Sequence, residues 1–457
     1  MVVIFAFVSA AVLALFGALH WYVWRRLVRD TTAKGSLLRR AGSVTFVAGP
    51  LLSIGAMTAE VADVPLLLQR ILAWPGYLWM ALFLYLLLAI LAGEAVRPVL
   101  RRWLARRDSG ADQRQGAPPT TQSAEAQAGD SGPEELVSAG EPLSATANRR
   151  DSDAVRGTAE PVAVLDPPPA PEPTPSADTT LTGPSRRLFV SRVVGGTAAA
   201  VAVGTVGHGT YSVLRGPKVK HLTVPLAKLP RSAHGFRIAV VSDIHVGPIL
   251  GRSFSQRVVD TINATQPDLI AVVGDLVDGT VENLTPAVEP LAQLRARHGT
   301  YFVTGNHEYI SGAAPWIEKV RELGLRPLEN ARTELPGFDL AGVNDVQGEE
   351  EGQGPDFEKA LGDRDRSRAA VLLAHQPVVI QDAVRHGVDL QLSGHTHGGQ
   401  LWPGNYLAEL ANPTVAGLER YGDTQLYVSR GAGAWGPPVR VGAPSDITVV
   451  KLASRQA

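Results

Sequence analysis

Residues 269–275 read LIAVVGD, five apolar residues followed by a glycine and an aspartate. A short, uninterrupted apolar run rich in valine and isoleucine is typical of a strand buried inside a sheet. Gly274 lets the backbone turn sharply where the strand ends, and Asp275 then lies at the edge of the sheet. We therefore predict a sheet whose strand ends carry polar side chains.

The same design recurs along the C-terminal half of the chain. Other apolar runs that read as buried strands, each followed by a polar cluster, lie at 237–242, 301–304, 370–374 and 389–392. Stretches with one apolar face, which we predict to be helices, lie at 253–265, 284–297, 314–323 and 378–386. Strands alternating with helices, followed by a strand-rich tail, predict a layered α/β domain over 220–457. A mixed sheet, or two sheets packed face to face with helices outside, is the natural form.

The polar clusters carry side chains that can bind a metal: Asp243-Ile244-His245, Gly305-Asn306-His307-Glu308, His375 and Gly394-His395-Thr396-His397. Taken singly they are ambiguous, because a lone Gly-Asp is more often a turn and a lone histidine is more often a core residue. Alternate positions of an extended segment point the same way, so Asp243 and His245 can reach one ion. Five of the chain's eleven histidines fall in these clusters. Together the clusters predict a two-metal site for phosphoester hydrolysis.

Composition restricts the chemistry of such a site. The chain has no cysteine and a formal net charge of −1. Disulfides and thiolate zinc sites are therefore excluded, and imidazole, carboxylate and amide ligands suit borderline-to-hard ions. A net charge near zero does not indicate a strongly charged partner. The sequence also lacks the patch of basic and aromatic residues that would support nucleic-acid binding. At 457 residues the chain has room for two or three domains.

The N-terminal part, residues 1–97, is predicted to be a transmembrane region. Apolar runs long enough to cross the bilayer lie at about 2–24, 42–59 and 71–93. Gly42, Pro50 and Gly55 weaken the second run. A secretory signal peptide is the alternative for the first run, but it lacks a basic N-terminal region. Basic residues at 25–40 and 97–107 place those segments in the cytoplasm, which predicts an outer N-terminus and three crossings.

Residues 98–184 are rich in proline, alanine, serine and acidic residues, and we predict a disordered linker. Residues 185–214 then begin with Ser185-Arg186-Arg187-Leu188-Phe189 and continue with a mildly apolar run, which resembles a twin-arginine export signal. An ordinary fourth transmembrane helix and an amphipathic helix that never crosses are the alternatives. If the segment crosses, the protein is a multi-pass cell-membrane protein with an extracytoplasmic catalytic domain. If it does not cross, the domain is cytosolic.

The order D-x-H, G-D, G-N-H-E, H, G-H-T-H is similar to that of the calcineurin-like metallophosphoesterase family, over about residues 235–452. The extended G-H-T-H-G-G-Q and the upstream membrane elements resemble the bacterial membrane-associated, twin-arginine-exported branch. The resemblance implies a four-layer α-β-β-α sandwich, with two mixed sheets flanked by helices. It also implies two divalent or trivalent ions, Mn, Fe or Zn.

Matched motif by motif, the resemblance assigns a first metal to Asp243, His245 and His397. It assigns a second metal to Asn306, His375 and His395, with Asp275 bridging the two. His307 would be the catalytic residue that helps protonate the leaving oxygen. Asp278 either supports these ligands or is a surface turn residue.

The implied function is a membrane-anchored metal-dependent phosphoesterase that acts by attack of a metal-bridging hydroxide. We expect its partners to be a phosphoester substrate, the lipid bilayer and the twin-arginine export machinery. A phosphodiester substrate, lipid- or envelope-linked, is favoured over a phosphomonoester. A non-catalytic scaffold or sensor for a phosphorylated ligand is a third hypothesis. Trp402 and Trp435 are candidate wall residues of the substrate site.

Overall fold

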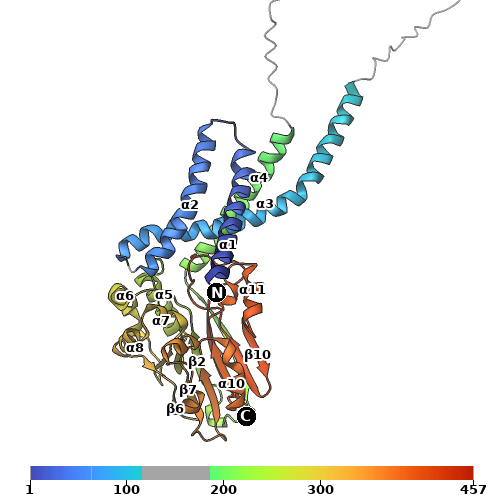
Figure 1. The fold of residues 1–457 in the computed structure, drawn as a ribbon. Coiled ribbons are helices and arrows are strands. Elements are labelled where there is room, and N and C mark those ends of the chain that lie inside the picture. The colour runs from blue at the N-terminus through green and yellow to red at the C-terminus, as the bar shows by residue number, and fades with distance from the viewer. Residues whose placement is uncertain (1, 63, 116–185, 456–457) are drawn as a thin grey trace, which may run out of the picture. The chain divides into compact units, whose positions relative to one another are not determined.

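The computed structural model describes residues 2–62, 64–115 and 186–455 (Figure 1). Met1–Arg102 and Arg186–Ala457 form one compact unit, and Trp103–Ser185 form another. Most of the predicted linker, from residue 116 to 184, lies outside the described residues.

Two six-stranded sheets form the C-terminal domain. The first has the order β1 (Lys218–Leu226), β12 (Asp446–Ser454), β2 (Arg237–Val241), β3 (Leu269–Val273), β4 (Thr300–Val303) and β5 (Arg326–Pro327). The second has the order β10 (Gly417–Tyr421), β11 (Thr424–Val428), β9 (Leu390–Ser393), β8 (Ala369–Leu373), β7 (Phe338–Gly342) and β6 (Ala331–Leu335). The central pairings, β2 with β3 with β4 and β7 with β8 with β9, are parallel. β12 with β2, β6 with β7 and β10 with β11 are antiparallel, so both sheets are mixed.

The two sheets face each other across a shared hydrophobic core. Val240 of β2 and Leu392 of β9 belong to the cluster between the sheets. Alternate strand positions face outward: Val241 packs in the cluster of Phe254, and Leu372 packs in the cluster of Phe357. The outer helices on the first sheet are α5 (Arg252–Ala264), α6 (Val281–Val288) and α8 (Ala313–Glu322); α9 (Phe357–Leu361) and α10 (Ile380–Arg385) cover the second. The predicted metallophosphoesterase-like fold, two mixed sheets with helices outside, is confirmed.

One predicted helix differs from the structure. The stretch 284–297 forms α6 only as far as Val288 and continues as a 3₁₀ segment, Glu289–Gln293. Pro290 explains the change, because proline has no amide hydrogen to continue the α-helical ladder and its ring disturbs the preceding turn. Two short helices near the predicted site, α7 (Asn306–Ser311) and α11 (Gly404–Ala411), have no counterpart in the prediction.

Four helices of the compact unit are long and apolar enough to cross a membrane. They are α1 (Val2–Trp24), α2 (Leu37–Val61), α3 (Leu66–Gln115) and α4 (Arg186–Leu214). α2 begins before the predicted residue 42, with the Ser36 side chain accepting a hydrogen bond from the Arg39 amide. α3 continues through 98–115, which the sequence prediction placed in the linker. This stretch is rich in arginine, alanine and leucine, residues that favour a helix.

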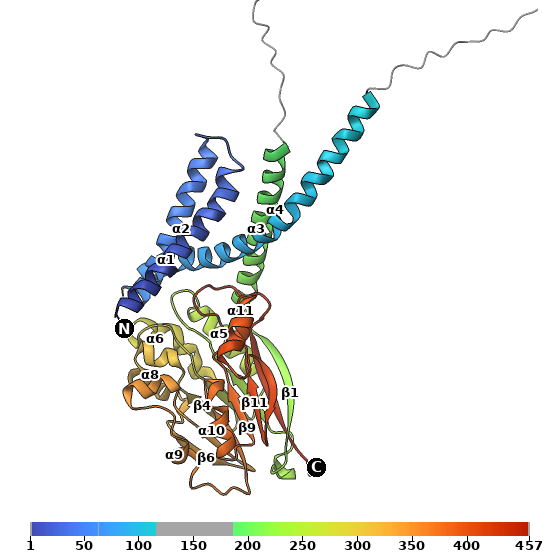
Figure 2. The ribbon, with the colours of Figure 1, turned by 45° about the vertical axis from the view of Figure 1, so that its right-hand side comes forward.

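The stretch of α3 from Arg70 to Tyr85 lies along one edge of the C-terminal domain (Figure 2). Arg70 Nε donates to the Pro248 carbonyl at 3.1 Å. The Tyr85 hydroxyl donates to the Trp402 carbonyl at 2.9 Å. Val439 of the domain belongs to the same apolar cluster as side chains of α3 and α4. The edge that α3 contacts is the one where the predicted site residues emerge.

Candidate metal centre

The predicted site residues follow the carboxyl ends of five parallel strands. Asp243 and His245 follow β2, Asp275 follows β3, and Asn306 begins α7 beyond β4. From the second sheet, His375 follows β8, and His395 and His397 follow β9. Because the carboxyl ends of parallel strands meet at one edge of each sheet, the two packed sheets bring all of these residues together.

The backbone at this edge is held in an uncommon conformation. Five of the seven predicted metal ligands have a positive φ, between 50° and 71°: Asp243, His245, Asp275, His395 and His397. This left-handed conformation costs on the order of 1–3 kcal/mol at a non-glycine residue and is concentrated at functional sites. Gly274 has a φ of 74°, in agreement with the turn predicted there, and a Cβ at this position would lie 2.5 Å from Nδ1 of His375.

The ligand atoms form two groups, in each of which all atoms lie within 4.8 Å of one another. In the first group, Nε2 of His397 lies 3.0 Å from Nε2 of His245 and 3.4 Å from Oδ1 of Asp243. The second group consists of Asp275, His375 and His395. Oδ1 of Asn306 lies 3.0 Å from Nδ1 of His395 and completes it.

Asp275 faces both groups. Its Oδ2 lies 3.1 Å from Nε2 of His375 and 3.8 Å from Nε2 of His245. One carboxylate between two clusters of imidazole nitrogens is the arrangement that a bridging metal ligand requires.

The donor set fits two cations. Oδ2 of Asp243 is buried and has no hydrogen-bond partner among the described residues. Burial, followed by the charge of His375, lowers the pKa of His395 to about 4. Burial, followed by the charge of His245, also lowers the pKa of His397. Burial also opposes the charged forms of His245 and His375, but Asp278 and Asp275 outweigh it and raise the pKa of these two histidines. The neutral imidazole that binds a metal ion is therefore favoured at His395 and His397.

Asp278 lies beneath the first group and contacts two histidines. Its Oδ1 lies 2.8 Å from Nδ1 of His245 and 2.8 Å from Nδ1 of His307. Burial alone would raise the pKa of Asp278, but the charges and hydrogen bonds of these histidines outweigh burial and lower it to about 2. Burial likewise opposes the charged form of His307, but Asp278 raises the pKa of His307 to about 9. The geometry therefore favours the hypothesis that Asp278 supports the site over the alternative that it is a surface turn residue.

Two further residues support the site without having been assigned a role from sequence. Glu308 is fully buried, and its carboxylate accepts from the amides of Asp275, Leu276 and Gly305 at 3.0, 2.7 and 2.6 Å. Glu308 belongs to the G-N-H-E motif, and this motif is the sequence signal that could have indicated its role. Buried Arg440 donates to the carbonyls of Gly433 and His397. No motif indicated Arg440.

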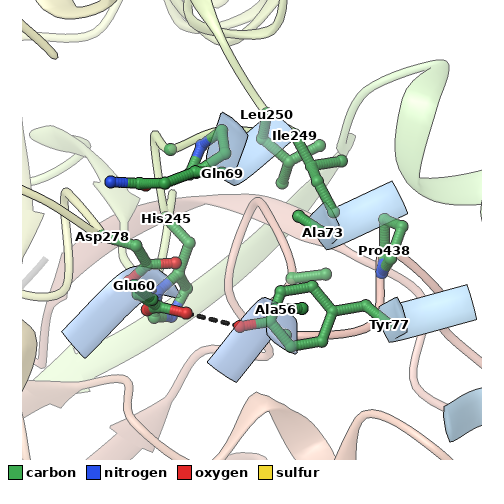
Figure 3. Close-up of a pocket in the computed structure, with 14 residues that line it drawn as sticks. Ala56, Glu60, Gln69, Ala73, Tyr77, His245, Ile249, Leu250, Asp278 and Pro438 are labelled. Atoms are coloured by element: carbon green, nitrogen blue, oxygen red, sulfur yellow. Dashed lines mark hydrogen bonds and ion pairs between the residues drawn. The ribbon is translucent and has the colours of Figure 1, made fainter. Parts of the chain in front are cut away.

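The N-terminal helices reach the back of the site (Figure 3). A cavity of about 30 Å³ is lined by Glu60 of α2 and Tyr77 of α3 together with His245 and Asp278. The Tyr77 hydroxyl donates to the Glu60 carboxylate. Residues of the predicted transmembrane region thus form part of the wall directly behind His245.

A much larger cleft, of about 1050 Å³, opens on the other side of the ligand groups. Its polar end is formed by Asp275, Asn306, His307, His395 and His397. The rest of its wall is mainly apolar and includes Met80, Leu84, Ile310, Leu401, Leu407 and Trp435. Of the two tryptophans proposed as wall residues, Trp435 lines this cleft, whereas Trp402 is not among the residues that line it.

Comparison with known proteins agrees with this geometry. A family model described as calcineurin-like phosphoesterase matches residues 236–399, the range that contains all seven predicted ligands. A zebrafish (Danio rerio) transmembrane protein with metallophosphoesterase domain is 40% identical over 259 residues, 54% of this chain and 59% of the relative. An uncharacterized metallophosphoesterase of Helicobacter pylori is 38% identical over 272 residues, 59% of this chain and 73% of the relative. One of Aquifex aeolicus is 33% identical over 55% of this chain and 97% of the relative. The match therefore spans less than two thirds of the zebrafish relative.

Proposed function

The chain belongs to the calcineurin-like phosphoesterase family, and from this premise we propose that it is a membrane-anchored two-metal enzyme that hydrolyses a phosphodiester. The position of Asp275 between two imidazole groups is the observation that carries the proposal. A single-metal or purely structural site has no need of a carboxylate that faces two sets of ligands.

In this proposal Asp243, His245 and His397 would hold one ion, Asn306, His375 and His395 would hold the other, and Asp275 would contribute to both sites. When bound, two ions would clamp the phosphoryl oxygens and supply hydroxide at neutral pH. The donor set suits Mn, Fe or Zn.

His307 provides the proton that the reaction requires. Hydrolysis forms a bond from a water oxygen to phosphorus and breaks the bond from phosphorus to the leaving ester oxygen, which must gain a proton. His307 lines the cleft beside Asn306, and Asp278 holds its imidazole protonated. A charged imidazole at this position stabilises the negative charge of the transition state and protonates the leaving oxygen.

The cleft favours a diester over a monoester. A diester has a second substituent that needs room beyond the phosphorus, and the cleft extends away from the ligand groups. A monoester carries more negative charge, yet the described residues that line the cleft include no lysine or arginine. A non-catalytic scaffold is disfavoured, because every ligand position and His307 keep a functional side chain.

We also propose that the domain is extracytoplasmic. Arg192, near the start of α4, donates from Nε to the Thr31 carbonyl at 3.1 Å, beside the basic segment 25–40. The first turns of α3 are instead close to the domain, through Arg70. If the basic segment is cytoplasmic, the domain lies on the other side. The Arg186-Arg187 pair at the start of α4, a helix less apolar than α3, supports twin-arginine export.

The test uses the full chain in lipid nanodiscs. Bound metals are quantified by mass spectrometry, and hydrolysis of bis(p-nitrophenyl) phosphate is compared with that of p-nitrophenyl phosphate. We expect metal-dependent diester cleavage that Asp275→Asn abolishes. His307→Ala should lower kcat by about 10²–10⁴-fold and leave the metal content unchanged, whereas the exposed control His221→Ala should leave both unchanged.

Preference for the monoester would change the assignment to a phosphatase. Loss of both metals in His307→Ala would show that the role given to His307 is wrong. Two bound metals with no turnover of either compound would favour the scaffold hypothesis.

A further inference from the structure

The wall of the large cleft joins two parts of the molecule that differ in environment. Its polar end belongs to the candidate metal centre, and part of its apolar wall, Met80 and Leu84, belongs to α3. α3 is one of the four helices that are long and apolar enough to cross a membrane. The cleft therefore runs from the ligand groups to a helix whose natural surroundings are lipid chains.

The opposite wall is exposed apolar surface. α11 has no buried residue. Of the residues that line the cleft on this side, Leu407 is 71% exposed, and Tyr406 and Trp435 are more than half exposed. A contiguous apolar patch on a water-soluble face would be unusual. Aromatic residues that expose both an apolar ring and a polar group are typical of the level of the lipid headgroups.

Charge restricts the occupant further. Asp275 is the one charged carboxylate among the described lining residues, and lysine and arginine are missing from that lining. Beyond the ligand groups, the polar side chains in the lining are those of Thr396, Gln400, Tyr406 and Asn412. A nucleotide or a phosphopeptide would depend on these few uncharged groups. Alkyl chains need no polar partner, because they are held by burial of apolar surface.

We propose that the substrate is a membrane phospholipid, and this inference rests on the proposed function. Its phosphodiester lies at the Asn306 and His395 end of the cleft, and its acyl chains lie between α11 and α3, against Leu407 and Leu84. The lipid reaches the cleft from the bilayer along α3, so the helices deliver the substrate as well as anchoring the domain.

The test measures how inhibition depends on chain length, which does not require the headgroup to be known. The full chain, loaded with manganese in nanodiscs, hydrolyses bis(p-nitrophenyl) phosphate in the presence of n-alkyl phosphates with two, four, six or eight carbons. We expect the inhibition constant to fall about threefold for each added methylene, near the fourfold expected for full burial of a methylene group.

Two matched variants on α11 distinguish binding of the alkyl phosphates in the cleft from their general partitioning into the nanodisc lipid. Leu407→Gln, on the cleft wall, should flatten the dependence on chain length to less than 1.5-fold for each methylene. Leu410→Gln, which is also exposed but does not line the cleft, should retain the wild-type slope. Equal slopes in both variants, or an inhibition constant that does not change with chain length, would overturn the lipid assignment while diester hydrolysis stands. If bis(p-nitrophenyl) phosphate is not hydrolysed at all, the proposed function fails, and the lipid assignment fails with it.

Discussion

Asp278 lies outside the proposed ligand set, yet it contacts two residues of the proposed site. One carboxylate oxygen lies within hydrogen-bond distance of both His245 and His307. At His245 this contact fixes which ring nitrogen carries the proton and leaves Nε2 available for a metal. At His307 it favours the charged imidazole. A ligand and a proton donor are therefore coupled through one side chain.

Asp278→Asn should move the alkaline limb of the kcat–pH profile to lower pH by about two units. The negative charge of Asp278 raises the pKa of His307 to about 9. Without it, burial is opposed only by the charges of Asp275 and Glu308, and the pKa falls toward its ordinary value of about 6.5. His307 is protonated below its pKa, so the variant loses its proton donor as the pH rises through neutrality. In the wild type, the alkaline limb of the kcat–pH profile should lie at or below about pH 9. An unchanged limb in Asp278→Asn would contradict the coupling between Asp278 and His307.

At the level of single residues, a large part of the candidate site could be predicted from the sequence. The seven ligand positions and His307 were named from motifs, and the structure brings them to one edge. The roles of Glu308 and Arg440 were missed, because they depend on burial and on backbone partners far away in sequence. Glu308 contacts the amide of Asp275 across the gap between two strands, a relationship that no local pattern reveals.

Among the elements, the first turn of α7 connects two loops of the candidate site. Glu308 lies in this turn and accepts from the amides at the ends of both β3 and β4. The two loops that carry Asp275 and Asn306 are therefore tied together by one buried carboxylate. Loss of such hydrogen bonds leaves buried donors unsatisfied.

Glu308→Ala should lower the free energy of unfolding of the C-terminal domain by about 3 kcal/mol, since three buried amide donors lose their acceptor. The urea midpoint, followed by tryptophan fluorescence, would measure the change. Glu308→Gln, which keeps an oxygen acceptor, is the matched variant and should lose less. If Glu308→Ala has the same midpoint as the wild type, the carboxylate does not hold the loops together.

Strands that are buried on both faces could be predicted, because their sequences are continuous apolar runs. β1 was not, since its sequence KVKHLTVPL mixes polar and apolar residues and it pairs with β12 from the far end of the domain. α11 was missed for a different reason. Its apolar residues lie on one side, but it is only eight residues long and none of them is buried in the protein, so the pattern is too short to identify a helix.

For the whole molecule, the question that matters is on which side of the membrane the domain lies. The contact of Arg192 with Thr31 and the contact of Arg70 with Pro248 lie at opposite ends of the helical region. If the helices cross the membrane as proposed, the basic segment and the domain lie on opposite sides of it.

Single cysteines can determine the orientation, because the chain has none of its own. In spheroplasts, a membrane-impermeant maleimide should label Glu350→Cys in the exposed part of the domain. It should label Lys34→Cys in the basic connector only after the membrane is permeabilised. The reverse pattern would place the domain in the cytosol and remove the case for twin-arginine export.

The contact of α3 with the domain between Arg70 and Tyr85 also has a consequence for inhibitor discovery. A water-soluble fragment that begins after α4 would lack Met80 and Leu84, and it would expose Val439 and Leu401. Such a fragment would keep the α11 side of the apolar wall, with Leu407, but would lack the α3 side. The full contribution of a hydrophobic tail becomes measurable only when α3 is present, so a screen has to be run on the intact chain.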